Sequence, residues 1–245
     1  INLRALSGVS ARELDYTITK ETSVGEQLNV LDSRSSSYSW DTQFELEVNP
    51  LHWLKGYANA DYQIVGVETR EHVIGSGYRG SMPLATYRLG STVSPNRRLN
   101  INVILAYTSQ DTLASSLLPS LSAELRLLDT KRLYLSGAIG RNCHLPSLND
   151  LYWQPGGNPN LLPEEGSQWE FGAGYGFPFQ QLSIDLDAHF FSSSVSNWIL
   201  WLPHLKGYWE PMNIPSVRAR GAELNTTLTF RASSFELGVK GSYSY

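Results

Sequence analysis

The 245-residue sequence has a single cysteine, Cys143, and no long hydrophobic run. One cysteine leaves no partner for an intrachain disulfide, and it excludes a metal site built from several thiolates. No stretch approaches the ~18 consecutive apolar residues that indicate a transmembrane helix. A membrane-spanning β-strand stays possible, because only every second residue of such a strand faces lipid.

Basic residues are also fewer than acidic ones. Nineteen Lys and Arg stand against 23 Asp and Glu, a formal net charge of −4. Nucleic-acid binding requires a basic surface, so no nucleic-acid partner is expected. The histidines lack the close spacing of a local zinc site, and no convergent acid, base and nucleophile set occurs. We therefore expect no catalytic residue, no metal, no cofactor and no enzyme activity.

Alternating polar and apolar residues are abundant, and they indicate an all-β fold. Between residues 182 and 190, for example, every second side chain is apolar, and the polar ones between them include Asp185, Asp187 and His189. About eleven such segments of roughly ten residues can be counted, close to the ~9–11 that a tilted strand needs to cross a membrane. No helical period persists. Short turns alternate with long polar loops, as in transmembrane barrels.

Polar or turn-forming stretches mark the expected connections. Loops are expected at 20–37, 68–82, 110–116 and 192–215, and tight turns at 49–50, 94–96 and 129–131. A bulge is expected near Gly221, where the alternation changes parity. The longest connection separates two strands in the segment 135–175, and a loop of that length is usually functional or disordered.

The order of motifs in this central segment resembles one known family. NCHLPSLNDLYW is followed by GGNPNLLPEEG, then by QWEFG, and later by RGAEL at 220–224. This order resembles the TonB-dependent outer-membrane receptors, particularly the branch containing cobalamin and related receptors. The sequence departs from the family's aromatic-Arg-Ala-Pro segment at Cys143, His144 and Leu145. Residues 147–157 also lack the His that haem receptors of the family place there.

The resemblance implies a transmembrane antiparallel up-and-down β-barrel with about eleven of the family's ~22 strands present. Residues 1–245 would be a portion of one outer-membrane barrel domain, without the N-terminal plug and the last strands. The implied function is TonB-energised uptake of a scarce large nutrient, a corrinoid, haem or iron-siderophore, across a Gram-negative outer membrane. The implied partners are the TonB complex, through the absent plug, outer-membrane lipid and the nutrient.

Aromatic and Asn residues of the two longest excursions are the candidate ligand contacts. They are Trp153, Asn158, Asn160, Trp201, His204, Tyr208 and Trp209. Aromatic rings can stack on a large planar ligand, although Trp and Tyr also anchor barrels at the lipid headgroups. Asn-Pro-Asn can equally serve only to form a turn.

Two other interpretations share the strand pattern. A passive porin-like barrel would have the same rhythm of strands and loops. A soluble β-sandwich for binding or adhesion would bury the apolar faces of two sheets against each other. Two stacked sheets would therefore rule out the nutrient importer.

Overall fold

The computed structural model describes residues 1–21, 27–73, 75–110, 114–128 and 133–245. They form eleven β-strands and one short α-helix. The elements are β1 (Asn2–Glu21), β2 (Gln27–Leu51), β3 (Leu54–Glu71), β4 (Ser76–Asn96), β5 (Leu99–Gln110), β6 (Ala114–Arg126), β7 (Leu133–His144), α1 (Leu148–Tyr152), β8 (Glu164–Phe179), β9 (Leu182–Pro203), β10 (Trp209–Arg231) and β11 (Glu236–Ser244).

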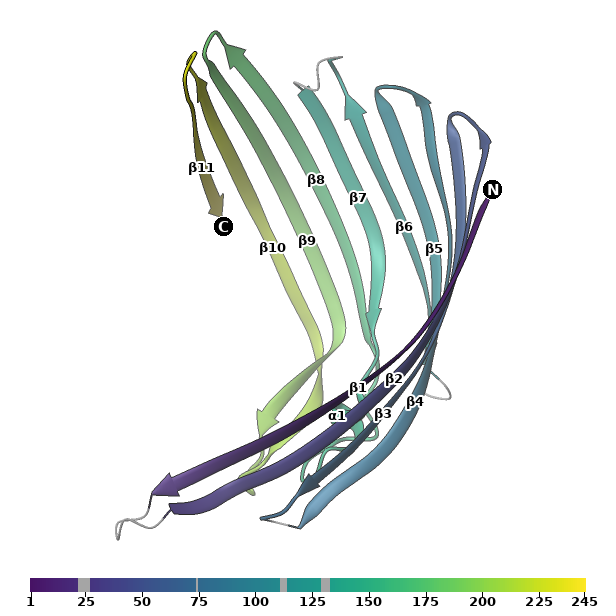
Figure 1. The fold of residues 1–245 in the computed structure, drawn as a ribbon, viewed down its shortest axis with the longest axis vertical. Coiled ribbons are helices and arrows are strands. Elements are labelled where there is room, and N and C mark those ends of the chain that lie inside the picture. Colours follow the sequence, from purple (N-terminus) through teal and green to yellow (C-terminus); the bar gives the residue numbers. More distant parts are fainter. Residues whose placement is uncertain (22–26, 74, 111–113, 129–132) are drawn as a thin grey trace.

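All eleven strands belong to one antiparallel sheet in chain order, so each strand pairs with its neighbours in sequence. The sheet is strongly curved and open, with β1 and β11 at its two edges (Figure 1). In the described part of the chain no second sheet packs against it. The predicted up-and-down, barrel-type fold is confirmed, and the β-sandwich alternative is wrong.

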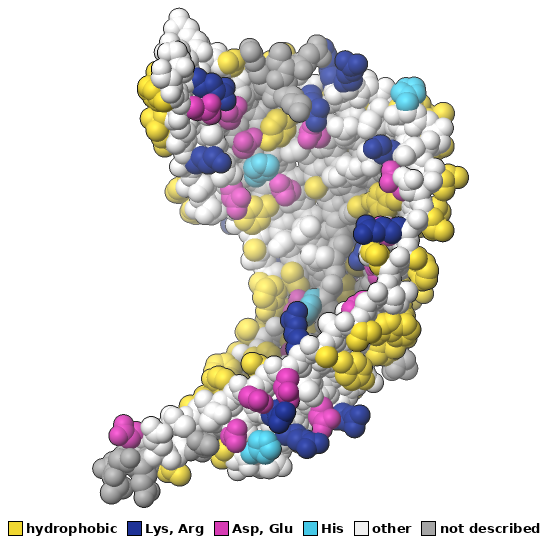
Figure 2. Space-filling view, in the orientation of Figure 1, with side chains coloured by type: hydrophobic (Ala, Val, Ile, Leu, Met, Phe, Trp, Pro, Cys, Tyr) yellow, Lys and Arg dark blue, Asp and Glu magenta, His cyan; other side chains and the backbone are white. Residues whose placement is uncertain are grey.

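The outer face of the sheet is apolar and uncovered. The strand register aligns its side chains across strands: Leu121 opposes Ile139, and Ile139 opposes Trp169. Trp169 keeps 50% of its surface exposed, although such residues are normally buried in a protein in water. Hydrophobic side chains lie along the outer margin of the curve, and charged side chains gather on the hollowed side (Figure 2). Among the described residues, no helix is long and apolar enough to cross a bilayer.

The inner face carries the polar side chains. An Arg88–Asp61 ion pair joins β4 to β3, and His189 Nδ1 lies 3.0 Å from Glu170 Oε1 between β9 and β8. Thr92 Oγ1 donates to an amide oxygen of β5 at 2.7 Å. This polar face, opposite an exposed apolar one, is the arrangement of a barrel with a wet interior.

A polar section interrupts the outer face toward one end of the strands. On β9, Ser192, Ser194 and Ser196 follow Phe190 on the same face, before Trp198 and Leu200 resume the apolar positions. A neighbouring outer position at this level is charged: Arg141 Nη2 lies 3.1 Å from the Oε2 atom of a β8 glutamate. The apolar section of β9 therefore runs over 182–190, a length that suits a tilted crossing. The strands continue well beyond it.

These extensions correct the predicted loops. Much of 27–37, 68–82 and 192–215 is paired strand. These tips lie beyond the continuous apolar section of the outer face, so the polar–apolar alternation weakens while the backbone pairing persists. Residues 22–26, 111–113 and 129–132 lie outside the described part, so the connections expected there are not described.

Two predicted turns and one bulge are also corrected. The structure includes Asn49-Pro50 in the last residues of β2, and the turn follows at 52–53. It likewise includes 94–96 in the last residues of β4, and the turn follows at 97–98. The register shifts beside each Pro, between Val48 and Leu51 and between Val93 and Asn96, because Pro has no N–H to donate to the ladder. Around Gly221 the register with β9 is continuous, so no bulge occurs there in that pairing.

Candidate functional site

The connection between β7 and β8, residues 145–163, folds onto the inner face and contains α1. A capping box starts this helix: Asp150 N donates to Ser147 Oγ at 3.2 Å, and Ser147 N donates to Asp150 Oδ2 at 2.9 Å. Leu148 and Leu151 are buried. Five residues are too few to show a helical period, but the Ser-x-x-Asp spacing resembles a capping signature that could have located α1.

One side of this connection rests on β4 and β5. The Tyr78 hydroxyl donates to Asn149 Oδ1, and the Tyr78 and Tyr152 rings lie 6.4 Å apart. Burial, reinforced by the Asp150 carboxylate, raises the pKa of Tyr78 to about 12, so its hydroxyl remains a donor at neutral pH. On β5, the side-chain Nε2 of Gln110 donates to the carbonyl of residue 146 at 3.1 Å.

The other side rests on the inner face of β9 and β10. Trp201 Nε1 donates to Asp150 Oδ1 at 2.9 Å, and Asn158 Nδ2 donates to the buried Pro211 carbonyl at 3.2 Å. Gly156, at φ 125°, lies so close to the backbone carbonyl of residue 209 that a Cβ there would collide with it. Figure 1 shows α1 at the same end of the sheet as the turn between β9 and β10.

Asn213 on β10 holds these segments together. Its Oδ1 accepts from Leu162 N at 2.9 Å. Its Nδ2 donates to the Leu162 carbonyl at 3.0 Å and to the Asn197 carbonyl at 2.7 Å. One side-chain amide thus satisfies three backbone groups on two segments. We call the assembly of residues 145–163 with 197–213 the loop platform.

The structure brings most of the predicted contact residues into the loop platform. Trp201 lies half-buried near the end of its strand, and its indole donates to Asp150. His204 and Tyr208 stack at 4.7 Å in the turn between β9 and β10. Trp209, at the start of β10, is 58% exposed. The prediction that Trp201 and Trp209 belong to a loop is therefore corrected, because both stand on strand ends.

The residues predicted in the first excursion divide into structural and exposed groups. Asn158 uses both ends of its amide within the platform, since its Oδ1 also accepts from Asn160 N at 3.0 Å. Trp153 is half-buried at the C-cap of α1. Asn160 is exposed. Asn158 therefore has the turn-fixing role, while the Asn160 side chain is exposed.

A cavity of about 610 Å³ lies beneath the platform, between residues 143–149 and the inner face of β2–β5. Its lining residues are Ser35, Ser37, Gln63, Val65, Val67, Met82, Leu84, Thr108, Gln110, Cys143, His144, Leu145, Pro146, Ser147, Leu148 and Asn149. Of these, the sequence motifs point only to the segment 143–149. The cavity joins positions over a hundred residues apart, so a local motif could not indicate it.

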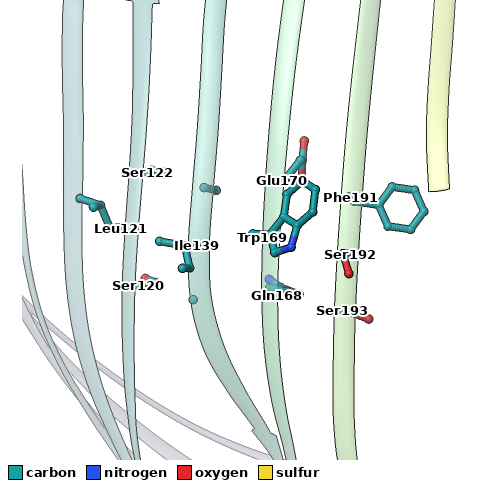
Figure 3. Close-up of a pocket in the computed structure, with 12 residues that line it drawn as sticks. Ser120, Leu121, Ser122, Ile139, Gln168, Trp169, Glu170, Phe191, Ser192 and Ser193 are labelled. Atoms are coloured by element: carbon teal, nitrogen blue, oxygen red, sulfur yellow. The ribbon is translucent and has the colours of Figure 1, made fainter. Parts of the chain in front are cut away.

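A second hollow, of about 410 Å³, lies on the sheet itself (Figure 3). Its lining comes from four adjacent strands, β6 to β9, and includes Ser120, Gln168, Glu170 and Ser193. No loop covers it in the described chain, and Glu170 is already paired with His189.

Cys143, at the edge of the larger cavity, should react slowly with thiol reagents near pH 7. Burial raises the pKa of this thiol above its ordinary value, so the reactive thiolate forms only at higher pH. The expected labelling rate rises with pH through and beyond the range of an ordinary thiol. Mass-spectrometric mapping of maleimide labelling in the folded protein measures it, with a free cysteine peptide as the reference. A rate equal to that of the peptide at pH 7 would contradict the prediction.

Comparisons with known proteins agree with this geometry. The family described as "TonB dependent receptor-like, beta-barrel" matches residues 5–245. The vitamin B12 transporter BtuB of Photobacterium profundum is 34% identical over 99 residues, 39% of this chain and 16% of that protein. BtuB of Vibrio vulnificus is 36% identical over 103 residues, 42% of this chain and 15% of that protein. The matches therefore span less than a fifth of these relatives.

Solved structures share the fold at low identity. The siderophore receptor PirA of Acinetobacter baumannii gives a TM-score of 0.66 at 13% identity, over 99% of this chain and 42% of that one. A mutant ferric enterobactin receptor, PfeA of Pseudomonas aeruginosa, gives 0.70 at 14%, over 98% and 41%. The Serratia marcescens hemophore receptor HasR, in complex with its hemophore HasA and heme, gives 0.66 at 14%, over 98% and 49%.

These relatives are transporters and receptors, which confirms the prediction that the chain is not an enzyme. They also confirm the family that the central motifs suggested, and barrels of that family are outer-membrane proteins of Gram-negative bacteria. With its family matched over almost its whole length and its strands arranged as in the solved receptors, the chain belongs to the TonB-dependent receptor-like β-barrel family.

Proposed function

We propose that the complete protein imports a large, scarce nutrient across the outer membrane and that TonB energises the transport. The loop platform carries this proposal. It is an ordered, aromatic-bearing surface on the inner face, at the end of the sheet where the strands extend beyond the apolar band. A passive pore does not require such a surface, whereas capture of a dilute ligand does.

In this proposal the outer face contacts membrane lipid and the platform faces the outside of the cell. Short turns at 52–53, 97–98 and 180–181 would then face the periplasm, as is usual for such barrels. Residues 1–245 would form a portion of one barrel domain, with β1 and β11 paired to further strands. Unpaired strand edges of this length would otherwise promote aggregation. A plug outside these residues would contact TonB.

A corrinoid is the first candidate nutrient, since the two curated relatives are vitamin B12 transporters. Haem and ferric siderophores are the other candidates, from the hemophore and siderophore receptors with the same fold. The test measures binding of all three classes to the complete receptor, and uptake in cells with and without TonB. Binding of none of them, or uptake that is independent of TonB, would contradict the proposal.

Replacing Trp209 with Ala should weaken nutrient binding about tenfold without unfolding the barrel. The ring is 58% exposed on the inner side of the platform, so its loss removes a stacking surface while little packing is lost. The matched control is Trp169→Ala, which removes an exposed Trp from the outer face of β8, outside the platform. Equilibrium binding to the detergent-solubilised receptor measures both. Equal affinities for wild type and Trp209→Ala would contradict a ligand contact at this residue.

A further inference from the structure

Gln110 gives the larger cavity an unused hydrogen-bond acceptor. Gln110 is fully buried, with 0% of its surface exposed. The side-chain Nε2 donates to the Pro146 carbonyl at 3.1 Å and also contacts Met82 Sδ. Its Oε1 is buried and has no partner in the described part of the chain. A buried acceptor without a donor is costly, so this oxygen indicates a missing N–H or O–H group.

The rest of the lining favours an uncharged ligand. Apart from Gln110 its polar groups, next to aliphatic side chains, are the amides of Gln63 and Asn149, the hydroxyls of Ser35, Ser37, Thr108 and Ser147, the imidazole of His144 and the thiol of Cys143. Among the described residues, no Asp, Glu, Lys or Arg lines the cavity. Carboxylates and other anions are usually held by Arg or Lys, and this lining has neither. Its volume of about 610 Å³ lies within the range of small-molecule sites.

A defined element also covers one side of the cavity, which is otherwise open. Residues 145–149 roof it, and the Gln110–Pro146 and Tyr78–Asn149 hydrogen bonds hold that roof on the sheet. A group entering the cavity would therefore contact both the barrel wall and the loop platform. This position can couple occupancy of the cavity to the order of the platform.

We propose that this cavity binds an uncharged, carboxamide-bearing part of the imported nutrient, which donates an N–H to Gln110 Oε1. The inference rests on the proposed function and narrows it. A neutral ligand with amide side arms, such as a corrinoid, fits the lining. The carboxylates of haem and the negative charge of a ferric triscatecholate do not.

The test measures equilibrium binding of cyanocobalamin, a neutral corrinoid with carboxamide arms, to the complete receptor in detergent. Gln110→Leu keeps the size of the side chain and removes the acceptor. Its affinity should fall about tenfold, the effect of one lost hydrogen bond with a donor left unpaired. The matched control is Gln168→Leu in the second hollow, which should leave the affinity unchanged.

A second substitution tests the cavity without touching its roof. Ser37→Phe fills the space from β2, where Ser37 pairs with Val67 of β3, and should abolish most of the cyanocobalamin binding. Its control is Ser193→Phe, which adds the same ring to the inner face of β9 at the second hollow. Thermal unfolding of each variant shows whether it is folded. If Gln110→Leu fails to fold, the cyanocobalamin affinity of Ser37→Phe alone tests whether the cavity binds the ligand.

The outcomes separate the two proposals. If the wild-type receptor binds neither cyanocobalamin, haem nor a ferric triscatecholate, the proposed function itself fails. If it binds cyanocobalamin and both cavity variants bind it equally well, the inference fails and the function stands. Preferential binding of haem or the triscatecholate, lost on Ser37→Phe, would overturn the uncharged-ligand assignment. Selective loss of cyanocobalamin binding in both variants would support it.

Discussion

Phe171→Arg is expected to lower the free energy of unfolding of the membrane-inserted receptor by ~2–4 kcal/mol. Phe171 lies on the outer face of β8 and opposes Gly137 on β7 and Phe190 on β9. Its side chain is exposed, as on the rest of the apolar face. In a bilayer a guanidinium at this position would meet hydrocarbon, where cations are most costly. Urea titration in liposomes, followed by tryptophan fluorescence, measures the loss.

Ser196→Arg is the matched control. Ser196 is exposed on the same face, beyond the first apolar section of β9, and lies opposite Ser216 of β10 and Glu165 of β8, so the added Arg meets no like charge directly opposite. An added Arg would stand in water or among headgroups, so its effect should stay within ~0.5 kcal/mol, as for other surface substitutions. Equal costs at both positions would mean that the apolar band is misplaced. No cost at Phe171 would mean that the outer face does not contact hydrocarbon.

The central sections of the strands could be predicted from sequence because one face of the sheet is polar and the other apolar. A strand in such a sheet must alternate polar and apolar residues. In 182–190 every second residue is apolar, and the structure places Leu186 and Phe190 on the outer face and His189 on the inner one. The number of strands and their order follow from the same pattern. Neither the number nor the order of the strands required knowledge of contacts between residues far apart in the sequence.

The strand tips and the site depend on information that the pattern lacks. Where both faces are polar, as at Ser192, Ser193 and Ser194, the sequence pattern no longer distinguishes a paired strand from a loop. The aromatic residues could be chosen as candidates by their type, but the Trp201–Asp150 contact joins residues 51 positions apart. Gln110, which lines the cavity, donates to the carbonyl of Pro146, a residue 36 positions away in the sequence. Such pairings are set by the tertiary fold. The sequence alone therefore predicted candidate contact residues but not the residues that they contact.

Asn213→Ala is expected to disorder the loop platform while the barrel wall stays folded. The substitution removes one acceptor and two donations, and it leaves Leu162 N, Leu162 O and Asn197 O without their side-chain partner. Each unsatisfied group costs ~1–3 kcal/mol where water cannot replace the bond. Among the described residues, the buried apolar side chains of the platform are three leucines, at positions 148, 151 and 161, and two prolines, at 146 and 211, so this loss is large compared with its packing.

Hydrogen–deuterium exchange of the complete receptor measures this effect directly. Peptides covering 145–163 should exchange at least tenfold faster in Asn213→Ala, while peptides from the membrane section of β8 should not change. Asn225→Ala is the matched control, because Asn225 is exposed on the same strand and pairs with residue 187 in the apolar section, away from the platform. Since the cavity roof belongs to the same platform, nutrient affinity should fall with its protection. Unchanged exchange at 145–163 would mean that Tyr78, Trp201 and Gln110 hold the platform without Asn213.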